Sequence, residues 1–335
     1  MDVPAPLTRF RSSINAAIAD TLTGRSGPLF DMMRHHLGWQ DGALLQGGKY
    51  LRPTLLLTTT EACGGDWKAA LPAAVALELL HNFSLIHDDI QDESPLRRNR
   101  ETVWKQWGAS QAINAGDGLH ALSQITLLRM ADDGAPERRV LLAGRMLDEA
   151  CLALCEGQYA DIAFQDRVSV TIADYEEMIG NKTAAAFRCA LELGCLLADG
   201  CAAKRSRLGE AGFKMGLAFQ IRDDALDLWG GPGIGKETAR DIADGKKSLP
   251  VVYGLSRAES ADAKRLHHLY RQGIGADDVD EVVGLLESLG APEYCARRAD
   301  EHWLAGRRMI EESGLPAPAI TSLTEIGDYL VRRDV

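Results

Sequence analysis

The sequence predicts an all-α fold, a single-domain bundle of ten or more helices with short connections. Long segments rich in Ala, Leu, Met and Glu carry apolar residues three and four positions apart, the spacing of one helix face. Alternating Val, Ile and Thr stretches with hairpin turns are nearly absent. Gly and Pro cluster between the helical segments, as at Gly64-Gly65. The clearest predicted helices are Ala69–His87, Val140–Gln158, Ile172–Leu197 and Lys204–Leu228.

The 335 residues favour one large domain, because no linker, low-complexity tract or internal repeat marks a boundary. We expect residues 1–20 to form an N-terminal segment that can be flexible and residues 21–335 to form the domain. The segment Met1–Leu22 lacks the basic start and apolar core of a signal peptide. No apolar run approaches the ~18 residues that span a bilayer. These features predict a cytoplasmic protein without a transmembrane segment.

Composition excludes two further classes of protein. The net charge is −11, whereas a nucleic-acid-binding surface has to be basic. The seven cysteines include no C-x-x-C pair. Cys151 and Cys155 share a helix face, but no His or second Cys pair completes a zinc site. We therefore expect no nucleic-acid partner and reduced thiols.

Two aspartate clusters carry the clearest chemical signal. Each has Asp at positions i, i+1 and i+4 and follows an apolar helical stretch. Residues i and i+4 lie on the same helix face, so the like charges repel unless a cation lies between them. Carboxylate oxygens, few per ion, suit Mg²⁺. The clusters are Asp88, Asp89 and Asp92, and Asp223, Asp224 and Asp227.

Cationic residues occur beside both clusters, as an anionic substrate such as a diphosphate requires. Arg offers a bidentate fork for phosphate oxygens and Lys a point charge. Gly47 and Gly48 precede two of these residues and allow close backbone approach. Taken alone, most of these cations are better explained as ordinary surface residues, and His81 as a core histidine, so the prediction depends on the set. The set is Lys49, Arg52, His81, Arg97, Arg98, Lys182, Lys236, Lys246 and Lys247.

A near match to a nucleotide-binding loop is the main competing pattern near the second cluster. Gly230, Gly235 and Lys236 have the spacing of a P-loop. However, Glu237 replaces the Ser or Thr that would hold Mg²⁺, and an acidic helix end precedes the glycines instead of a buried strand. A Gly-rich lid beside a metal site fits this segment better.

In combination, these motifs resemble those of the trans-isoprenyl diphosphate synthase family, which includes farnesyl and geranylgeranyl diphosphate synthases. The resemblance runs from about Gly47 to Pro250 and includes the arginine pair after the first cluster and Phe219-Gln220 before the second. It implies a bundle around a deep central cavity and a homodimer. It also implies three Mg²⁺ ions on the allylic diphosphate, held chiefly by Asp88, Asp92 and Asp223, with the other three aspartates supporting.

The resemblance also implies a role for each remaining polar residue. Isopentenyl diphosphate would be held by Lys49, Arg52, His81 and Arg98. The allylic diphosphate would be held by Arg97, Lys182, Thr183, Phe219, Gln220, Lys236 and Lys246, with Lys182 also catalytic. The run Glu156-Gly157-Gln158-x-x-Asp161 resembles a further family signature, with Gln158 near the first metal pair.

Three positions depart from the family pattern, and none is a metal ligand. Tyr50 stands where many members have Arg, although others carry Tyr. Asn99 replaces the Gly after the arginine pair, which could alter that turn. Ser248 replaces a Thr and keeps the hydroxyl.

The expected reaction is condensation of isopentenyl diphosphate with dimethylallyl, geranyl or farnesyl diphosphate by ionisation, condensation and elimination. The growing chain should extend toward the N-terminal side of the first cluster's helix. Phe83 lies five residues before Asp88, about 7.5 Å along a helix axis, and would close the tunnel there, beside the small Ser84. By resemblance, this arrangement implies geranylgeranyl diphosphate as product, with farnesyl diphosphate second; the alternative for Phe83 is an ordinary core position.

Two other functions remain open on sequence grounds. A terpene cyclase on the same scaffold would ionise a longer substrate and fold it, and it would need no second diphosphate pocket. A non-catalytic partner subunit or helical metal-binding module would need neither chemistry, although complete aspartate clusters disfavour it.

Overall fold

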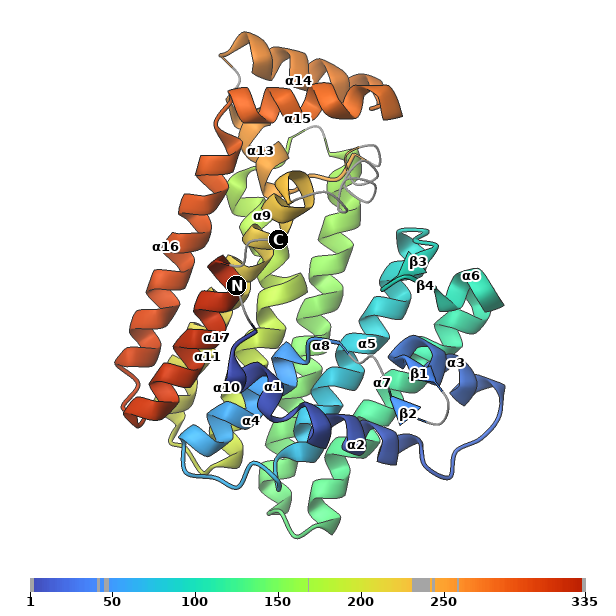
Figure 1. The fold of residues 1–335 in the computed structure, drawn as a ribbon, viewed down its shortest axis with the longest axis vertical. Helices are drawn as coiled ribbons and strands as arrows, with labels where there is room; N and C mark the ends of the chain where they lie inside the picture. Colours follow the sequence, from blue (N-terminus) through green and yellow to red (C-terminus); the bar gives the residue numbers. More distant parts are fainter. Residues whose placement is uncertain are drawn as a thin grey trace.

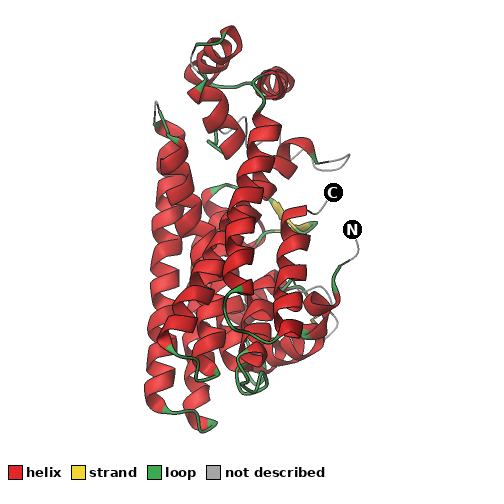
Figure 2. Cartoon of the chain, turned by 90° about the vertical axis from the view of Figure 1, so that its left-hand side faces the viewer, coloured by secondary structure: helices red, strands yellow, loops and turns green. Residues whose placement is uncertain are grey.

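The computed structural model describes residues 3–40, 43–44, 48–167, 169–230, 242, 245–257 and 259–332. The all-α prediction is confirmed, because helices make up nearly all the regular structure of these residues (Figure 2). The helices are α1 (Ala5–Arg9), α2 (Arg11–Leu22), α3 (Pro28–Leu37), α4 (Leu51–Ala62), α5 (Leu71–Gln91), α6 (Val103–Trp107), α7 (Ala109–Asp132), α8 (Glu137–Asp166), α9 (Ile172–Ile179), α10 (Ala185–Leu197), α11 (Ala202–Trp229), α13 (Leu249–Ser256), α14 (Ala261–Gln272), α15 (Val279–Ser288), α16 (Ala291–Glu311) and α17 (Ala317–Arg332), with a π-helix η1 (Gly180–Ala184) and a 3₁₀-helix η2 (Ala276–Asp278).

Two very short antiparallel strand pairs are the β-structure of this part of the chain. Strand β1 (Trp39–Gln40) pairs with β2 (Ala43–Leu44), and β3 (Leu96–Arg97) pairs with β4 (Arg100–Glu101). Arg98 and Asn99 connect β3 to β4 with φ values of 51° and 60°. Asn tolerates this left-handed conformation better than most residues, so Asn99 is compatible with the turn where the family pattern has Gly.

Helix α5 lies at the centre of the bundle. Pro72 lies in its first turn, where the missing N–H costs nothing. Ala73, Val75 and Leu77 are among a run of consecutive residues that are fully buried. A helix that is apolar all round has to be covered on every side, and α5 accordingly packs against α4 and most extensively against α7.

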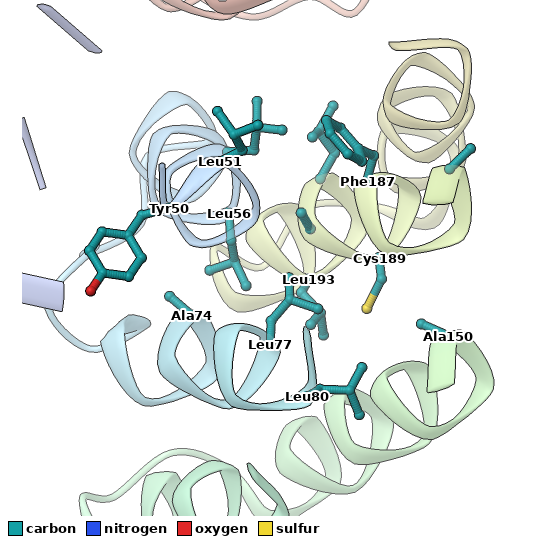
Figure 3. Packing of buried hydrophobic residues seen from close by; sticks show 14 of the residues in the cluster. Tyr50, Leu51, Leu56, Ala74, Leu77, Leu80, Ala150, Phe187, Cys189 and Leu193 are labelled. Carbon is teal, nitrogen blue, oxygen red and sulfur yellow. The ribbon is translucent and has the colours of Figure 1, made fainter. Parts of the chain in front are cut away.

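Helices α4, α5, α8 and α10 form the part of the main core that Figure 3 shows. Leu56, Leu77 and Leu193 interdigitate there, and the side chain of Phe187 closes one side (Figure 3). Gly194 makes the contact between α4 and α10 possible, because a Cβ at this position would lie 2.5 Å from the carbonyl oxygen of Leu56. The core therefore fixes α5 relative to its neighbours.

The predicted helix Ile172–Leu197 is interrupted in the structure. It consists of α9, the π-helix η1 and α10. A π-turn contains one residue more per turn than an α-helix and is frequent at functional sites. Here it contains Lys182 and Thr183, two of the predicted site residues.

The two ends of the chain also form helices that pack on the bundle. Phe10, Ile14 and Ile18 of the N-terminal region are buried in the main core, although the division into residues 1–20 and one domain stays a prediction. A second, smaller apolar cluster joins α13, α14 and α15, and α14 and α15 lie across one end of the molecule (Figure 1). Among the helices of the described residues, none combines the length and apolar character needed to cross a membrane.

Candidate active site

The two aspartate clusters lie at the C-terminal ends of α5 and α11. Asp92 caps α5, and Asp227 lies in the last turn of α11. A helix dipole places partial negative charge at this end, so added carboxylates are unfavourable unless cations compensate them. The position of both clusters therefore creates a demand for positive charge.

A cavity of about 130 Å³ connects the second cluster with cationic side chains. Its polar lining includes Asp224 and Asp227 of α11 together with Lys182 and Lys246. Nζ of Lys246 lies 3.3 Å from Oδ2 of Asp92 in the first cluster. Lys246 thus contacts the first cluster while lining the same cavity as the second, and both clusters border one polar region.

Lys182 brings a third carboxylate into this region. Its Nζ donates a hydrogen bond to Oδ2 of Asp161 on α8 at 2.5 Å. Burial lowers the pKa of Lys182, but Asp161 and Asp88 raise it more, so the net shift is upward and the ammonium stays charged. Burial raises the pKa of Asp88, Lys182 lowers it, and Asp92 raises it again. Three carboxylates, those of Asp88, Asp92 and Asp161, thus act on one ammonium group, so this part of the site carries an excess of negative charge.

The middle aspartate of each cluster faces protein. Asp89 is only 1% exposed and accepts a 2.8 Å hydrogen bond from Nε of Arg97. Burial raises the pKa of Asp89 to about 6, and Arg97 opposes that shift. Asp224 is 9% exposed and accepts three hydrogen bonds, described below. The i and i+4 aspartates are more accessible than these two, and Asp227 is exposed.

The predicted isopentenyl diphosphate residues approach one another around α5. A Cβ on Gly48 would lie 2.8 Å from a terminal nitrogen of Arg98, so the segment that contains Lys49 passes directly over this guanidinium. Burial lowers the pKa of His81, and the charges of Arg52 and Arg98 lower it further. The Nε atom of Arg52 is enclosed without a hydrogen-bond partner. A buried, unsatisfied cationic donor is what an anionic ligand would complete.

Four further residues contribute to the candidate site, and two of them, Glu78 and Tyr175, were not singled out from the sequence. Glu78 is buried beside Arg52 and Arg98. Lys247 donates to the carbonyl oxygens of Phe164 (2.5 Å) and Gln165 (2.9 Å) at the end of α8. The others are Asp161 and Tyr175. Asp161 belongs to a motif that the sequence had singled out, whereas Tyr175 carried no signal because a Tyr in an amphipathic helix is ordinary.

The remaining predicted residues lie as follows. Thr183 is buried, and its hydroxyl donates to Oε1 of Gln220 at 2.8 Å. The ring of Phe219 lies 5.4 Å from that of Phe187. Gln158 is buried and donates to Gln91. Lys236 lies outside the described residues.

Phe83 lies at the contact between α5 and α7. Its ring centroid is 4.9 Å from that of His87 and 5.2 Å from that of His120. The neighbouring Ser84 is buried and donates to the carbonyl oxygen of His81. Three rings therefore gather below the first cluster on the α7 side.

A divalent cation fits the donor chemistry without a preformed cage. Among the described residues, no three Asp, Glu, His or Cys side chains converge closely enough to hold an ion by themselves. Mg²⁺ is usually bound by one or two carboxylates, with substrate phosphates and water completing the octahedron. Asp88 and Asp92 at i and i+4 on one side and Asp223 on the other offer such incomplete ligand sets.

The all-α fold and the gathering of acidic and basic side chains in one region indicate an enzyme with an anionic substrate. A model of the polyprenyl synthetase family matches residues 41–286. The geranylgeranyl diphosphate synthase of Mycobacterium tuberculosis is 35% identical over 96% of this chain and 92% of its own. A (2E,6E)-farnesyl diphosphate synthase of Mycobacterium bovis is 36% identical over 94% and 88%.

A solved structure agrees with these relatives. The polyprenyl synthase of Caulobacter crescentus, complexed with calcium and isoprenyl diphosphate, superposes with a TM-score of 0.85 at 27% identity, covering 98% of both chains. The chain therefore belongs to the polyprenyl synthetase family and is a trans-prenyltransferase.

Proposed function

We propose that this enzyme condenses isopentenyl diphosphate with an allylic diphosphate and releases geranylgeranyl diphosphate, with farnesyl diphosphate as the second candidate. The observation that carries the proposal is the presence of two separate groups of cationic side chains, each suited to a diphosphate. One group is Lys182 and Lys246, which line the cavity beside the second aspartate cluster, and the other is Arg52 and Arg98, whose charges act on His81. A condensation needs both diphosphates bound at once.

The acidic cavity would take the allylic diphosphate with Mg²⁺, three ions by family resemblance. Asp88, Asp92 and Asp223 would be the principal ligands. Held by these carboxylates, the ions would supply positive charge to neutralise the leaving diphosphate. The bound calcium and isoprenyl diphosphate of the Caulobacter crescentus relative support a divalent cation at such a site.

The protein groups have separate tasks in the reaction. Lys182 and Lys246 stabilise the charge that develops on the departing oxygens. Arg52, His81 and Arg98, with Lys49, hold the second substrate so that its double bond faces the allylic carbon. The apolar faces of α5 and α7 exclude water, which would otherwise capture the carbocation. The released diphosphate, by family resemblance, accepts the proton that completes elimination.

Incubation of the purified chain with labelled isopentenyl diphosphate and each of three primers tests the proposal. The primers are dimethylallyl, geranyl and farnesyl diphosphate, and the dephosphorylated alcohols are separated by chromatography. We expect Mg²⁺-dependent C20 alcohol that disappears on chelation with EDTA. Cyclic hydrocarbons formed without isopentenyl diphosphate would identify a terpene cyclase instead. Failure of the purified chain alone to release diphosphate would indicate a non-catalytic subunit.

Product length should depend on Phe83. If its ring closes the tunnel between α5 and α7, Phe83→Ala opens space for further isoprene units, and the main product should become longer than that of the wild type. Chromatography against alcohol standards measures this shift. The control is Phe213→Ala, because Phe213 packs near Gly180 and Arg188 on another side of the bundle. Products no longer than those of the wild type would contradict the assignment of Phe83 to the tunnel floor.

A further inference from the structure

The two middle aspartates occupy equivalent places in their clusters, but their contacts differ in extent. Both oxygens of Asp224 accept hydrogen bonds, whereas Asp89 uses Oδ1 and its Oδ2 is buried without a hydrogen-bond partner among the described residues. Each follows the first aspartate of its cluster, which turns it by about 100° around the helix. Asp89 and Asp224 are the two buried members of the six aspartates. Each of them accepts hydrogen bonds from a different segment, and that segment carries a predicted substrate-binding cation.

Asp89 connects α5 to the β3–β4 hairpin. Its Oδ1 accepts from Nε of Arg97, which belongs to β3. The backbone N–H of Ser94 also donates to the carbonyl oxygen of Asp89 at 2.9 Å. The contact through Nε orients the guanidinium plane of Arg97. Because this group is rigid and planar, the directions of its two terminal nitrogens are then fixed as well.

Asp224 joins three helices. Its Oδ2 accepts from the hydroxyl of Tyr175 on α9 at 2.6 Å and from the backbone N–H of Leu249 at the start of α13 at 3.1 Å. Its Oδ1 accepts from Nε2 of Gln220 at 2.9 Å. Gln220 in turn accepts from Thr183 in the π-helix. With both oxygens engaged by the protein, Asp224 has little capacity left for an ion.

The bond to Leu249 is important because of what precedes it in the chain. Lys246, which contacts Asp92, lies three residues before Leu249. Lys247 between them is anchored to the end of α8. The segment 246–249 is therefore attached to α5, α8 and α11 in turn, and Asp224 with Tyr175 provides the attachment to α11.

We infer that Asp89 and Asp224 are positioning residues and not metal ligands. Asp89 orients Arg97, while Asp224, held by Tyr175, fixes the segment that carries Lys246, so that both cations face the allylic diphosphate. Tyr175, which is fully buried, acts on the reaction only through Asp224. This inference rests on the proposed function, since it assigns roles within the same site.

Comparison of carboxylate variants by metal binding and by kinetics tests the inference. The variants are Asp88→Asn and Asp223→Asn on one side, and Asp89→Asn, Asp224→Asn and Tyr175→Phe on the other. Calorimetric titration of Mg²⁺ into each protein with inorganic diphosphate measures metal affinity without turnover. We expect the first pair to weaken Mg²⁺ binding strongly, because each substitution removes one of the few carboxylates that would hold the ion, and the second group to weaken it much less.

The kinetic expectation separates positioning from general loss of structure. Tyr175→Phe should raise KM for the allylic diphosphate by roughly 10-fold, the size expected when a hydrogen bond to a charged group is lost, with KM for isopentenyl diphosphate unchanged. A merely structural role would lower kcat through a smaller active fraction and leave both KM values alone. Tyr270→Phe is the matched control, because the hydroxyl of Tyr270 is enclosed without a hydrogen-bond partner.

Each remaining outcome has a definite meaning. Weakened Mg²⁺ binding in Asp89→Asn or Asp224→Asn, to the extent seen in Asp88→Asn, would overturn the inference by making them ligands. An unchanged KM in Tyr175→Phe would overturn it for Asp224, even if the Asn variant fails to fold. By contrast, a wild-type protein that makes no elongated product would contradict the proposed function itself.

Discussion

Glu78 is a buried carboxylate between two arginines in the proposed isopentenyl diphosphate pocket. Burial raises its pKa to about 6, while Arg52, Arg98 and a hydrogen bond from Asn82 lower it. Its neighbour His81 has a lowered pKa for the same leading reason, burial. The pocket thus combines two permanent cations with an acid and an imidazole that both resist ionisation, which keeps its net charge positive.

The raised pKa of Glu78 makes a prediction about stability and pH. The folded state binds the proton of the Glu78 carboxyl more tightly than the unfolded chain does, where this carboxyl titrates near 4.5. The protonated carboxyl therefore stabilises the fold in full below pH 4.5, and this stabilisation is lost as pH rises to about 6. Glu78→Gln cannot ionise and escapes this loss. Between pH 4.5 and 7, its free energy of unfolding should therefore gain about 2 kcal/mol relative to the wild type.

Urea denaturation of both proteins across this pH range measures the difference. Asn82 can still donate to the amide oxygen that the Glu78→Gln substitution introduces, so the variant keeps the local hydrogen bond. If the difference in free energy of unfolding between the two proteins stays constant with pH, folding does not raise the pKa of Glu78.

For single residues, the sequence indicated which residues belong to the candidate site but not the direction in which each side chain points. The spacing i and i+4 correctly placed Asp88 and Asp92 on one side of a helix. It could not show that Asp89 faces protein, because α5 is buried nearly all round and an apolar pattern without a polar side gives no direction. Tyr175 was missed because its partner, Asp224, is 49 positions away in the sequence.

Among the elements, the π-helix η1 depends on close contact with α8. A Cβ on Gly157 would lie 2.2 Å from the backbone nitrogen of Lys182 and 2.6 Å from its Cα. Backbone atoms cannot rotate away, so only Gly allows α8 to approach η1 this closely. The contact holds Lys182 beside Asp161, which lies one helical turn after Gly157.

Gly157→Ala should consequently displace η1 from α8. We expect a loss of about 1–3 kcal/mol in stability, the usual cost of overpacking, and a fall of roughly 10-fold or more in kcat because the Lys182–Asp161 pair separates. Thermal unfolding and steady-state kinetics measure these effects. Gly144→Ala on the same helix is the control, since its Cβ would meet only Leu127 at 3.8 Å, an ordinary contact. Equal behaviour of the two variants would refute the packing argument.

Helices could be predicted where their side-chain pattern determines them, and not where a contact with another helix does. Long amphipathic and apolar segments gave α5, α8 and α11 correctly, because their side-chain periodicity is a property of the sequence itself. The interruption at Gly180–Ala184 depends on a neighbouring helix, and a single sequence does not reveal that contact. The gathering of Gly48, Arg52, His81 and Arg98 from three segments was available only through family resemblance.

At the scale of the whole molecule, the surface of α7 and α8 gives information about assembly. Large apolar side chains are exposed there, including Leu128 (53%), Leu141 (70%), Leu152 (61%) and Tyr159 (76%). Exposed apolar side chains concentrated on one surface mark an interaction site more often than chance exposure. With the homodimer that family resemblance implies, we propose that these two helices form the contact with a second copy of the chain.

In a twofold symmetric dimer, each substitution on this surface acts twice. Leu152→Glu would place two carboxylates in an apolar interface, so the dimer should dissociate about 1,000-fold more readily, from roughly 2 kcal/mol per buried charge. Sedimentation equilibrium should then show the mass of one chain for this variant and twice that mass for the wild type. Leu304→Glu is the matched control, because Leu304 is similarly exposed (54%) but belongs to α16. If Leu304→Glu dissociates the protein and Leu152→Glu does not, the interface lies elsewhere; if the wild type is itself monomeric, the exposed apolar surface has another partner.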